Sequence, residues 1–80
     1  MRIDKFLKVS RILKRRALAQ EATNGGRVTV NGKVVKPSFR IKVGDVVCVA
    51  FNSGSVTFKV LQIKETVKKD EVDTLYEIID

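Results

Sequence analysis

The sequence predicts one α+β domain, in which two N-terminal helices pack on a small, mostly antiparallel sheet and a short helix follows at the C-terminus. This prediction rests on a change of period at Gly26: apolar residues recur at helical spacing before it and alternate with polar residues after it. A length of 80 residues leaves room for a single core, because a second domain would need roughly 50 further residues.

The first helix is predicted from four residues at i, i+3, i+4 and i+7, the spacing that places side chains on one helix face. These residues are Ile3, Phe6, Leu7 and Ser10. Arg2 and Lys5 lie off this stripe, so we expect a helix with one apolar and one basic face.

The second helix is predicted to begin at Lys14 or Arg15 and to end at Asn24, because Gly25-Gly26 suits a left-handed helix stop. Its apolar stripe consists of Leu18, Ala19 and Ala22. Basic residues at its start oppose the helix dipole, so we expect a compensating anion there, such as a phosphate.

A β-hairpin is predicted next. Val28 and Val30 alternate with Thr29, and Asn31-Gly32 is the pair that type I′ turns prefer. The return strand at Val34-Val35 is broken by Lys36-Pro37-Ser38, because proline has no N–H to donate.

Two more strands are expected, at Val46 to Phe51 and at Val56 to Leu61, joined by the loop at 52–55. From Lys69 to Ile79 apolar residues return at helical spacing, which predicts a short acidic helix docked on the sheet. We therefore divide the chain into a domain of helices and strands at 1–62 and an acidic C-terminal tail at 63–80.

The composition excludes several classes of function. With one cysteine and no histidine, the chain can form neither an internal disulfide nor a typical zinc site nor a histidine acid–base pair. We expect no catalytic residue, no metal and no cofactor. No apolar run is long enough for a membrane span or a signal peptide, so we expect no membrane partner and a cytoplasmic location.

The charge distribution points to nucleic acid. The net charge is +7, and seven of the first sixteen residues are basic against one acid, whereas residues 63–80 are acidic overall. Four of those seven are arginines, whose planar forks bind phosphates in a bidentate manner. The residues expected to bind RNA are Arg2, Lys5, Arg11, Lys14, Arg15 and Arg16.

Other features are better explained by structure than by a site. The aromatic residues are expected in the core rather than as stacking platforms for bases, namely Phe6, Phe39, Phe51, Phe58 and Tyr76. Cys48 is expected to be a small core residue. The glycine pairs match no phosphate-binding loop, and the carboxylates between 70 and 77 suit a helix surface better than a metal site.

Five motifs in order resemble the RNA-binding domain named after ribosomal protein S4, over residues 1 to about 50. They are Arg2-Ile3-Asp4-Lys5-Phe6-Leu7, Arg15-Arg16-Ala17-Leu18-Ala19, Gly26-Arg27-Val28-Thr29-Val30-Asn31-Gly32, Lys36-Pro37-Ser38 and Gly44-Asp45. The resemblance implies an alpha-L motif of two helices, a hairpin and a following strand. Arg15 stands where that family usually has serine, so a cation replaces a helix-capping hydroxyl.

The full length resembles small stand-alone members of this family that are related to heat-shock protein fifteen. The resemblance implies a monomeric, non-enzymatic factor of ribosome-associated quality control. Such a factor binds rRNA and tRNA on large ribosomal subunits obstructed by peptidyl-tRNA, and supports C-terminal alanine tailing by an RqcH-type tailing factor.

Three alternatives remain. A structural or assembly rRNA-binding protein would carry the same basic face. Enzymes such as pseudouridine synthases also contain this domain, but here no room remains for a catalytic domain. A DNA-binding helix-turn-helix regulator normally needs a third, recognition helix, whereas this chain turns to strands after Gly26.

Overall fold

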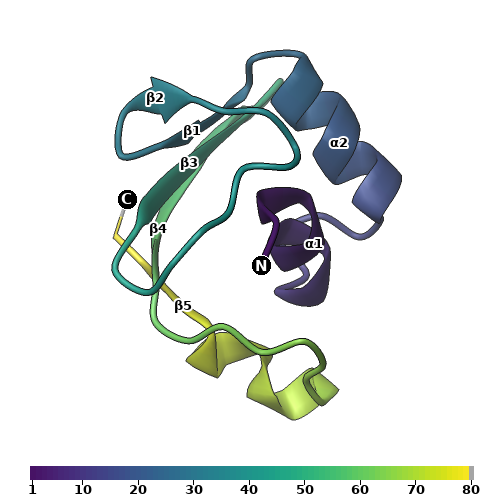
Figure 1. The fold of residues 1–80 in the computed structure, drawn as a ribbon, viewed down its shortest axis with the longest axis vertical. Helices are drawn as coiled ribbons and strands as arrows, with labels where there is room; N and C mark the ends of the chain where they lie inside the picture. Colours follow the sequence, from purple (N-terminus) through teal and green to yellow (C-terminus); the bar gives the residue numbers. More distant parts are fainter. Residues whose placement is uncertain (80) are drawn as a thin grey trace.

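The structure is a computed structural model that describes residues 1–79. One five-stranded antiparallel sheet, in the order β2-β1-β3-β4-β5, carries the two N-terminal helices on one face (Figure 1). The elements are α1 (Ile3–Val9), α2 (Arg16–Asn24), β1 (Val28–Val30), β2 (Lys33–Val34), β3 (Val46–Phe51), β4 (Gly54–Val60), the 3-10 helix η1 (Lys69–Thr74) and β5 (Tyr76–Ile78). No helix within the described residues is long and apolar enough to cross a membrane.

The core lies between α1 and the inner face of the sheet. All four residues of the predicted stripe on α1 are buried, and the ring of Phe6 stacks on Phe58 of β4 with ring centres 6.1 Å apart. Tyr76 of β5 meets Phe58 edge-on at 5.5 Å. The buried Ser10 hydroxyl donates a hydrogen bond to the Leu7 carbonyl, so it is not left without a partner. The predicted α+β architecture is confirmed.

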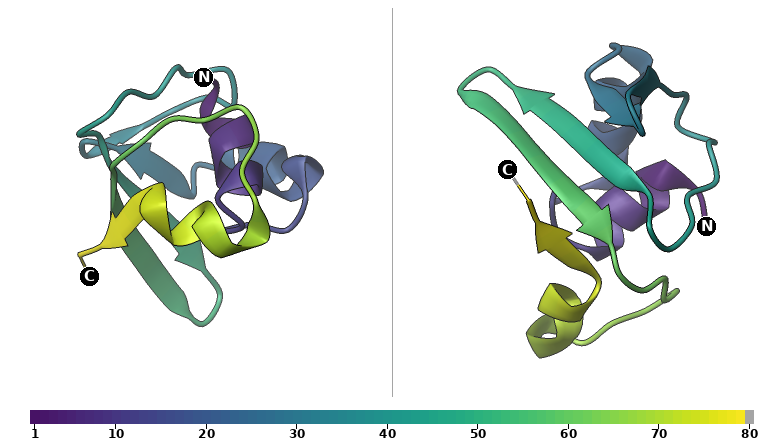
Figure 2. Two further views of the ribbon diagram at one scale, coloured as in Figure 1. Left: turned by 90° about the horizontal axis from the view of Figure 1, so that it is seen from below. Right: turned by 90° about the vertical axis from the view of Figure 1, so that its left-hand side faces the viewer.

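The predicted turns are confirmed where glycine provides the backbone geometry. Asn31 and Gly32 have φ values of 52° and 86°, as a type I′ turn requires. Gly26 has φ 75° and adopts the left-handed conformation two residues after the end of α2. β3 has the predicted bounds, whereas β4 begins earlier than predicted, because Gly54 already pairs with Phe51. β3 and β4 form the longest hairpin of the sheet (Figure 2).

The helix predicted from Lys69 to Ile79 is correct only in its first half. η1 ends at Thr74, and Tyr76–Ile78 forms β5, which pairs antiparallel with β4. The edge of β4 offers backbone hydrogen bonds that helical spacing does not reveal: the Leu75 carbonyl accepts from the Leu61 N–H at 2.8 Å. The acidic tail therefore joins the sheet.

Two predictions about buried residues are wrong. Cys48 is half-buried and lies on the outer face of β3, opposite to Val47 and Val49, because side chains alternate along a strand. Phe39 and Phe51 are each 37% exposed, since Phe39 lies in a turn and Phe51 is the last residue of β3, at the end of the sheet. Of the predicted core phenylalanines, the two that stack on each other are fully buried.

Candidate nucleic-acid interface

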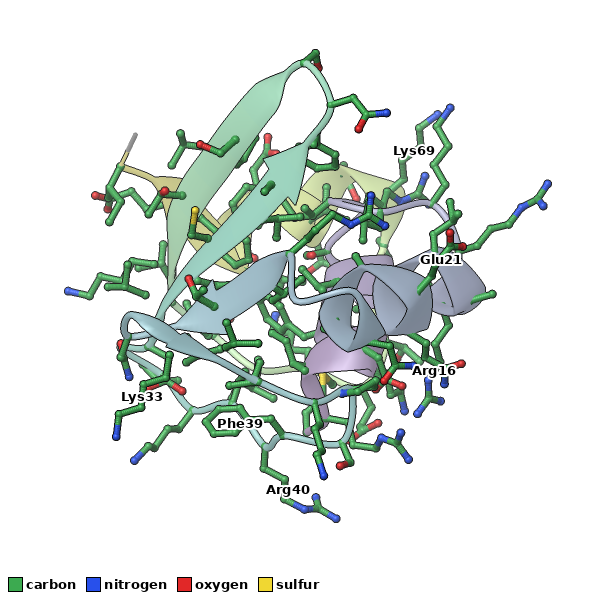
Figure 3. The ribbon with its side chains drawn as sticks, turned by 90° about the horizontal axis from the view of Figure 1, so that it is seen from above. Arg16, Glu21, Lys33, Phe39, Arg40 and Lys69 are labelled. Carbon is green, nitrogen blue, oxygen red and sulfur yellow. The ribbon has the colours of Figure 1, made fainter. Side chains whose placement is uncertain are left out.

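The predicted RNA-binding residues lie on α1, on α2 and on the loop that joins them. The two helices pack against each other, which brings the cations of the first sixteen residues onto neighbouring elements. We call this group of cations the basic face, and its residues are Arg2, Lys5, Lys8, Arg11, Lys14, Arg15 and Arg16. Figure 3 shows the side chains that project from the molecule, with Arg16 labelled.

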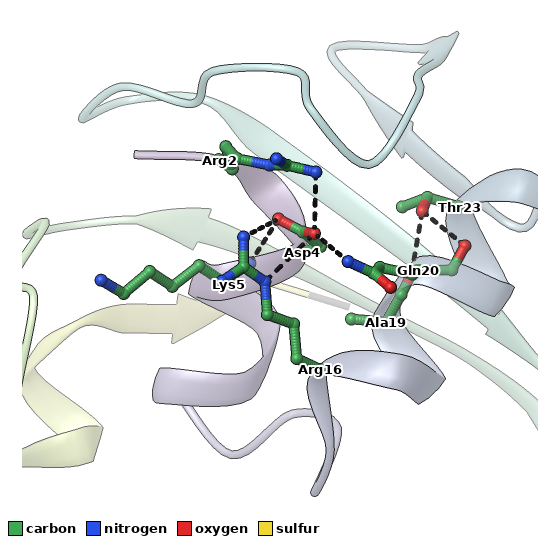
Figure 4. Close-up of polar contacts among 7 residues, drawn as sticks. All are labelled: Arg2, Asp4, Lys5, Arg16, Ala19, Gln20 and Thr23. Carbon is green, nitrogen blue, oxygen red and sulfur yellow. Dashed lines mark hydrogen bonds and ion pairs between the residues drawn. The ribbon is translucent and has the colours of Figure 1, made fainter.

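The carboxylate of Asp4 brings Arg2 and Arg16 together (Figure 4). Asp4 is fully buried, and its Oδ2 accepts hydrogen bonds from Arg2 Nη2 at 3.2 Å and from Arg16 Nε at 3.2 Å. Gln20 Nε2 donates to the same oxygen at 3.0 Å, and the Lys5 backbone N–H donates to Oδ1 at 2.8 Å. We call these four side chains, Arg2, Asp4, Arg16 and Gln20, the Asp4 cluster.

The environment of Asp4 keeps its carboxylate charged. Burial by itself would raise the pKa of Asp4, but hydrogen bonds from Gln20, Arg16 and the Lys5 backbone, together with the charge of Arg16, hold that pKa below its ordinary value. One carboxylate offsets one of the two guanidinium charges. The Arg2 and Arg16 side chains remain 42% and 43% exposed, so the cluster presents a net positive, oriented pair to solvent.

Lys5 is held differently. Its ammonium forms an ion pair with Glu65, in the segment that follows β4. The ion pair holds the pKa of Glu65 below its ordinary value through hydrogen bonding to Lys5. The acidic part of the chain therefore reaches back to the basic face and neutralises one of its cations.

The loop between the helices gathers a second group of cations. Arg11 and Lys14 line a cavity of about 540 Å³ together with Lys8. Arg11 adopts a left-handed backbone conformation with φ 64°, and its N–H donates to the Lys8 carbonyl at 3.0 Å. This conformation usually costs a residue with a side chain about 1 kcal/mol. The loop therefore keeps an arginine where glycine would be less strained.

Arg15 occupies the N-cap position of α2. Its backbone is extended, and within the described residues no side chain caps the start of this helix. The cation that replaces the usual serine leaves the backbone N–H groups there without a side-chain acceptor.

Sequence reasoning missed the residues that organise these cations. It gives Asp4 no part in the site, although Asp4 is the only acid among the first sixteen residues, which is the available signal. Gln20 carries no signal, because its partner lies 16 positions away. Lys8 contributes to the predicted charge of the first helix but is absent from the predicted site.

Comparisons with known proteins identify relatives of this chain in sequence and in fold. The S4 domain family matches residues 1–47. An RQC P-site tRNA stabilizing factor of Halalkalibacterium halodurans is 51% identical over 78 residues, which cover 98% of this chain and 89% of the relative. The Bacillus subtilis factor of the same name is 47% identical, with 99% and 92% covered. The trimeric structure of Vibrio cholerae heat shock protein 15 superposes with a TM-score of 0.90 at 29% identity, over 98% of this chain and 80% of that one.

Proposed function

Because the chain belongs to the S4-domain family of RQC P-site tRNA stabilizing factors, we propose that it binds RNA on large ribosomal subunits and stabilises tRNA in the P site. The Asp4 cluster is the observation that carries this proposal. One buried carboxylate contacts two arginines at the starts of two different helices, and both arginine side chains stay partly exposed.

The geometry of the cluster suits contact with two RNA backbones. Arginine binds phosphate through a planar fork, and a fork that is already oriented loses less conformational entropy on binding. Arg2 lies at the start of α1 and Arg16 at the start of α2. We infer that rRNA lines one flank of the helix pair and that tRNA lines the other, so that two weak contacts act together through effective concentration.

We also propose a finer assignment. We infer a non-enzymatic, monomeric protein of the cytoplasm that recognises large subunits obstructed by peptidyl-tRNA. By holding the tRNA it would support C-terminal alanine tailing of the nascent chain by an RqcH-type tailing factor. We infer that the basic residues in this role are those expected from the sequence, together with Lys8, which lines the same cavity as Arg11 and Lys14.

Co-sedimentation tests this function. The protein should be retained on large subunits that bear peptidyl-tRNA far better than on empty ones at physiological salt, and Arg16→Ala should reduce that difference. Arg27→Ala is the matched control, because Arg27 is exposed and lies outside the Asp4 cluster. Equal retention on both populations would contradict the proposal and leave a structural or assembly rRNA-binding protein.

A further inference from the structure

A groove of about 590 Å³ lies beside the hairpin of β1 and β2, away from the cavity of Arg11 and Lys14. Its apolar lining includes Val34 and Phe39, which are 64% and 37% exposed. Lys33 and Lys36 lie along the same groove. We call it the Phe39 groove. Exposed apolar side chains and cations therefore meet in one concave surface.

The backbone holds Phe39 firmly in place. Its N–H donates to the Lys36 carbonyl at 3.0 Å, which closes a turn through Pro37, and its carbonyl accepts from the Ile3 N–H at 2.7 Å. The Pro37 carbonyl accepts from the Asp4 N–H at 3.3 Å. The turn that carries the ring is thus tied to the first residues of α1, where the Asp4 cluster begins. A ring on such a turn is pre-organised for binding.

The charge around the groove has one sign. Among the described residues that line it, Lys33 and Lys36 are charged and no side chain is acidic. Arg40 follows Phe39 and forms an isolated backbone bridge with Arg2, which joins this region to the basic face. Figure 3 shows Phe39 between Lys33 and Arg40 on one side of the molecule. A ligand that suits this surface combines a flat apolar face with negative charge.

We propose that the Phe39 groove binds an unpaired nucleotide of RNA, with its base stacked on Phe39 and its phosphate paired with Lys33 or Lys36. The inference rests on the proposed function and deepens it, because it adds contact with a base to recognition of phosphates. Aromatic rings stack on bases of any sequence, but only where the base face is not covered by its neighbours in a duplex. The groove therefore selects unpaired RNA.

Phe51 provides the contrast. It is exposed to the same extent as Phe39, at 37%, and it also lines a cavity, of about 240 Å³. That cavity contains Glu21 as well as Arg27, so its formal charges balance and it lacks attraction for phosphate. Changes at Phe51 are the matched control for changes at Phe39.

Fluorescence offers a direct test, because the chain contains no tryptophan. Phe39→Trp and Phe51→Trp each introduce a single reporter, to be titrated with a hairpin RNA that has an unpaired loop and with a blunt duplex of equal phosphate number. Stacking predicts that the hairpin strongly quenches the indole fluorescence of the Phe39→Trp variant and that the duplex does not. Neither RNA should quench the Phe51→Trp variant. Equal quenching of the Phe39→Trp variant by both RNAs, or none, would overturn the groove assignment.

Affinity provides the second test. Phe39→Leu, which keeps an apolar side chain but removes the ring, should weaken binding to the hairpin about tenfold and leave binding to the duplex unchanged. Lys36→Gln should also weaken binding to the hairpin. Phe51→Leu should weaken neither binding to the hairpin nor binding to the duplex. Thermal unfolding of each variant shows whether it is folded. If Phe39→Leu leaves hairpin binding intact but reduces retention on ribosomal subunits, the groove contacts protein and the inference is wrong.

The two proposals fail in different ways. If the wild-type protein binds neither RNA, the proposed function fails. If it binds both RNAs in a manner that depends on Arg16, and Phe39 has no influence, only the groove assignment fails.

Discussion

At the scale of residues, a single carboxylate contacts two arginines of the basic face. Asp4 connects Arg2 and Arg16, which lie at the starts of different helices and are 14 positions apart in the sequence. The sequence identified both arginines as RNA-binding candidates from their type and crowding. It could not show that they share one partner, because that contact exists only once α1 and α2 have packed.

The Asp4 cluster predicts a pH-dependent stability. Because the pKa of Asp4 is lowered in the folded protein, its contribution is fully present above the unfolded pKa of about 4 and is lost as pH falls through the folded pKa. Asp4→Asn should lower the free energy of unfolding at neutral pH by about 2 kcal/mol, since it leaves hydrogen-bond donors and charges of the cluster unmatched.

Urea denaturation of both proteins between neutral pH and about pH 3 measures this effect. The difference between them should shrink as the solution becomes acidic, because a protonated Asp4 resembles the asparagine. Asp70→Asn, at an exposed position of η1, should change stability by less than about 0.5 kcal/mol. A difference that stays constant with pH would argue against the charged cluster.

At the scale of elements, short sequence patterns correctly predicted the turn and the helix face that depend only on neighbouring residues. Asn31-Gly32 specified its turn, and the stripe on α1 specified its buried face, because each pattern acts within a few residues. The C-terminal segment shows where such signals fail. Helical spacing relates Val72, Leu75 and Tyr76, but Tyr76 pairs with Val60 on β4. No local sequence pattern shows that the edge of β4 is available for another strand.

Gly32→Val tests the hairpin. Gly32 has φ 86°, a conformation that β-branched residues rarely adopt, so the substitution should destabilise the fold by about 1 to 3 kcal/mol. Lys33→Val is the control, because Lys33 is exposed in β2, where β-branched residues are favoured. Thermal unfolding distinguishes them. A melting temperature that does not fall for Gly32→Val would contradict the turn type.

Glu65→Gln tests the contact between the C-terminal segment and the basic face. The substitution removes the ion pair that occupies Lys5, so affinity for RNA should rise a few-fold at low salt through one additional phosphate contact. Asp73→Asn removes a negative charge from exposed η1 without touching Lys5, and it controls for the change in net charge. Equal gains from both variants would show that only net charge matters.

At the scale of the whole molecule, the positive charge is concentrated in the first sixteen residues, which carry seven basic side chains and one acid. If about five or six phosphates are neutralised, RNA affinity should fall roughly a thousandfold between about 50 and 200 mM salt. A filter-binding titration over this range measures the slope, and Arg16→Ala should make it shallower by about one phosphate. A nearly flat titration would show that the basic face does not contact the RNA backbone.

The order of the strands also affects how readily other polypeptide chains can pair with the edges of the sheet. Both margins of the sheet are short, with two residues in β2 and three in β5, while the long strands β3 and β4 lie inside. Exposed strand edges are templates on which other extended chains can assemble. The protein proposed here works beside unfinished polypeptides, and its short edge strands offer them little backbone to pair with. It can therefore stay close to aggregation-prone chains without co-aggregating with them.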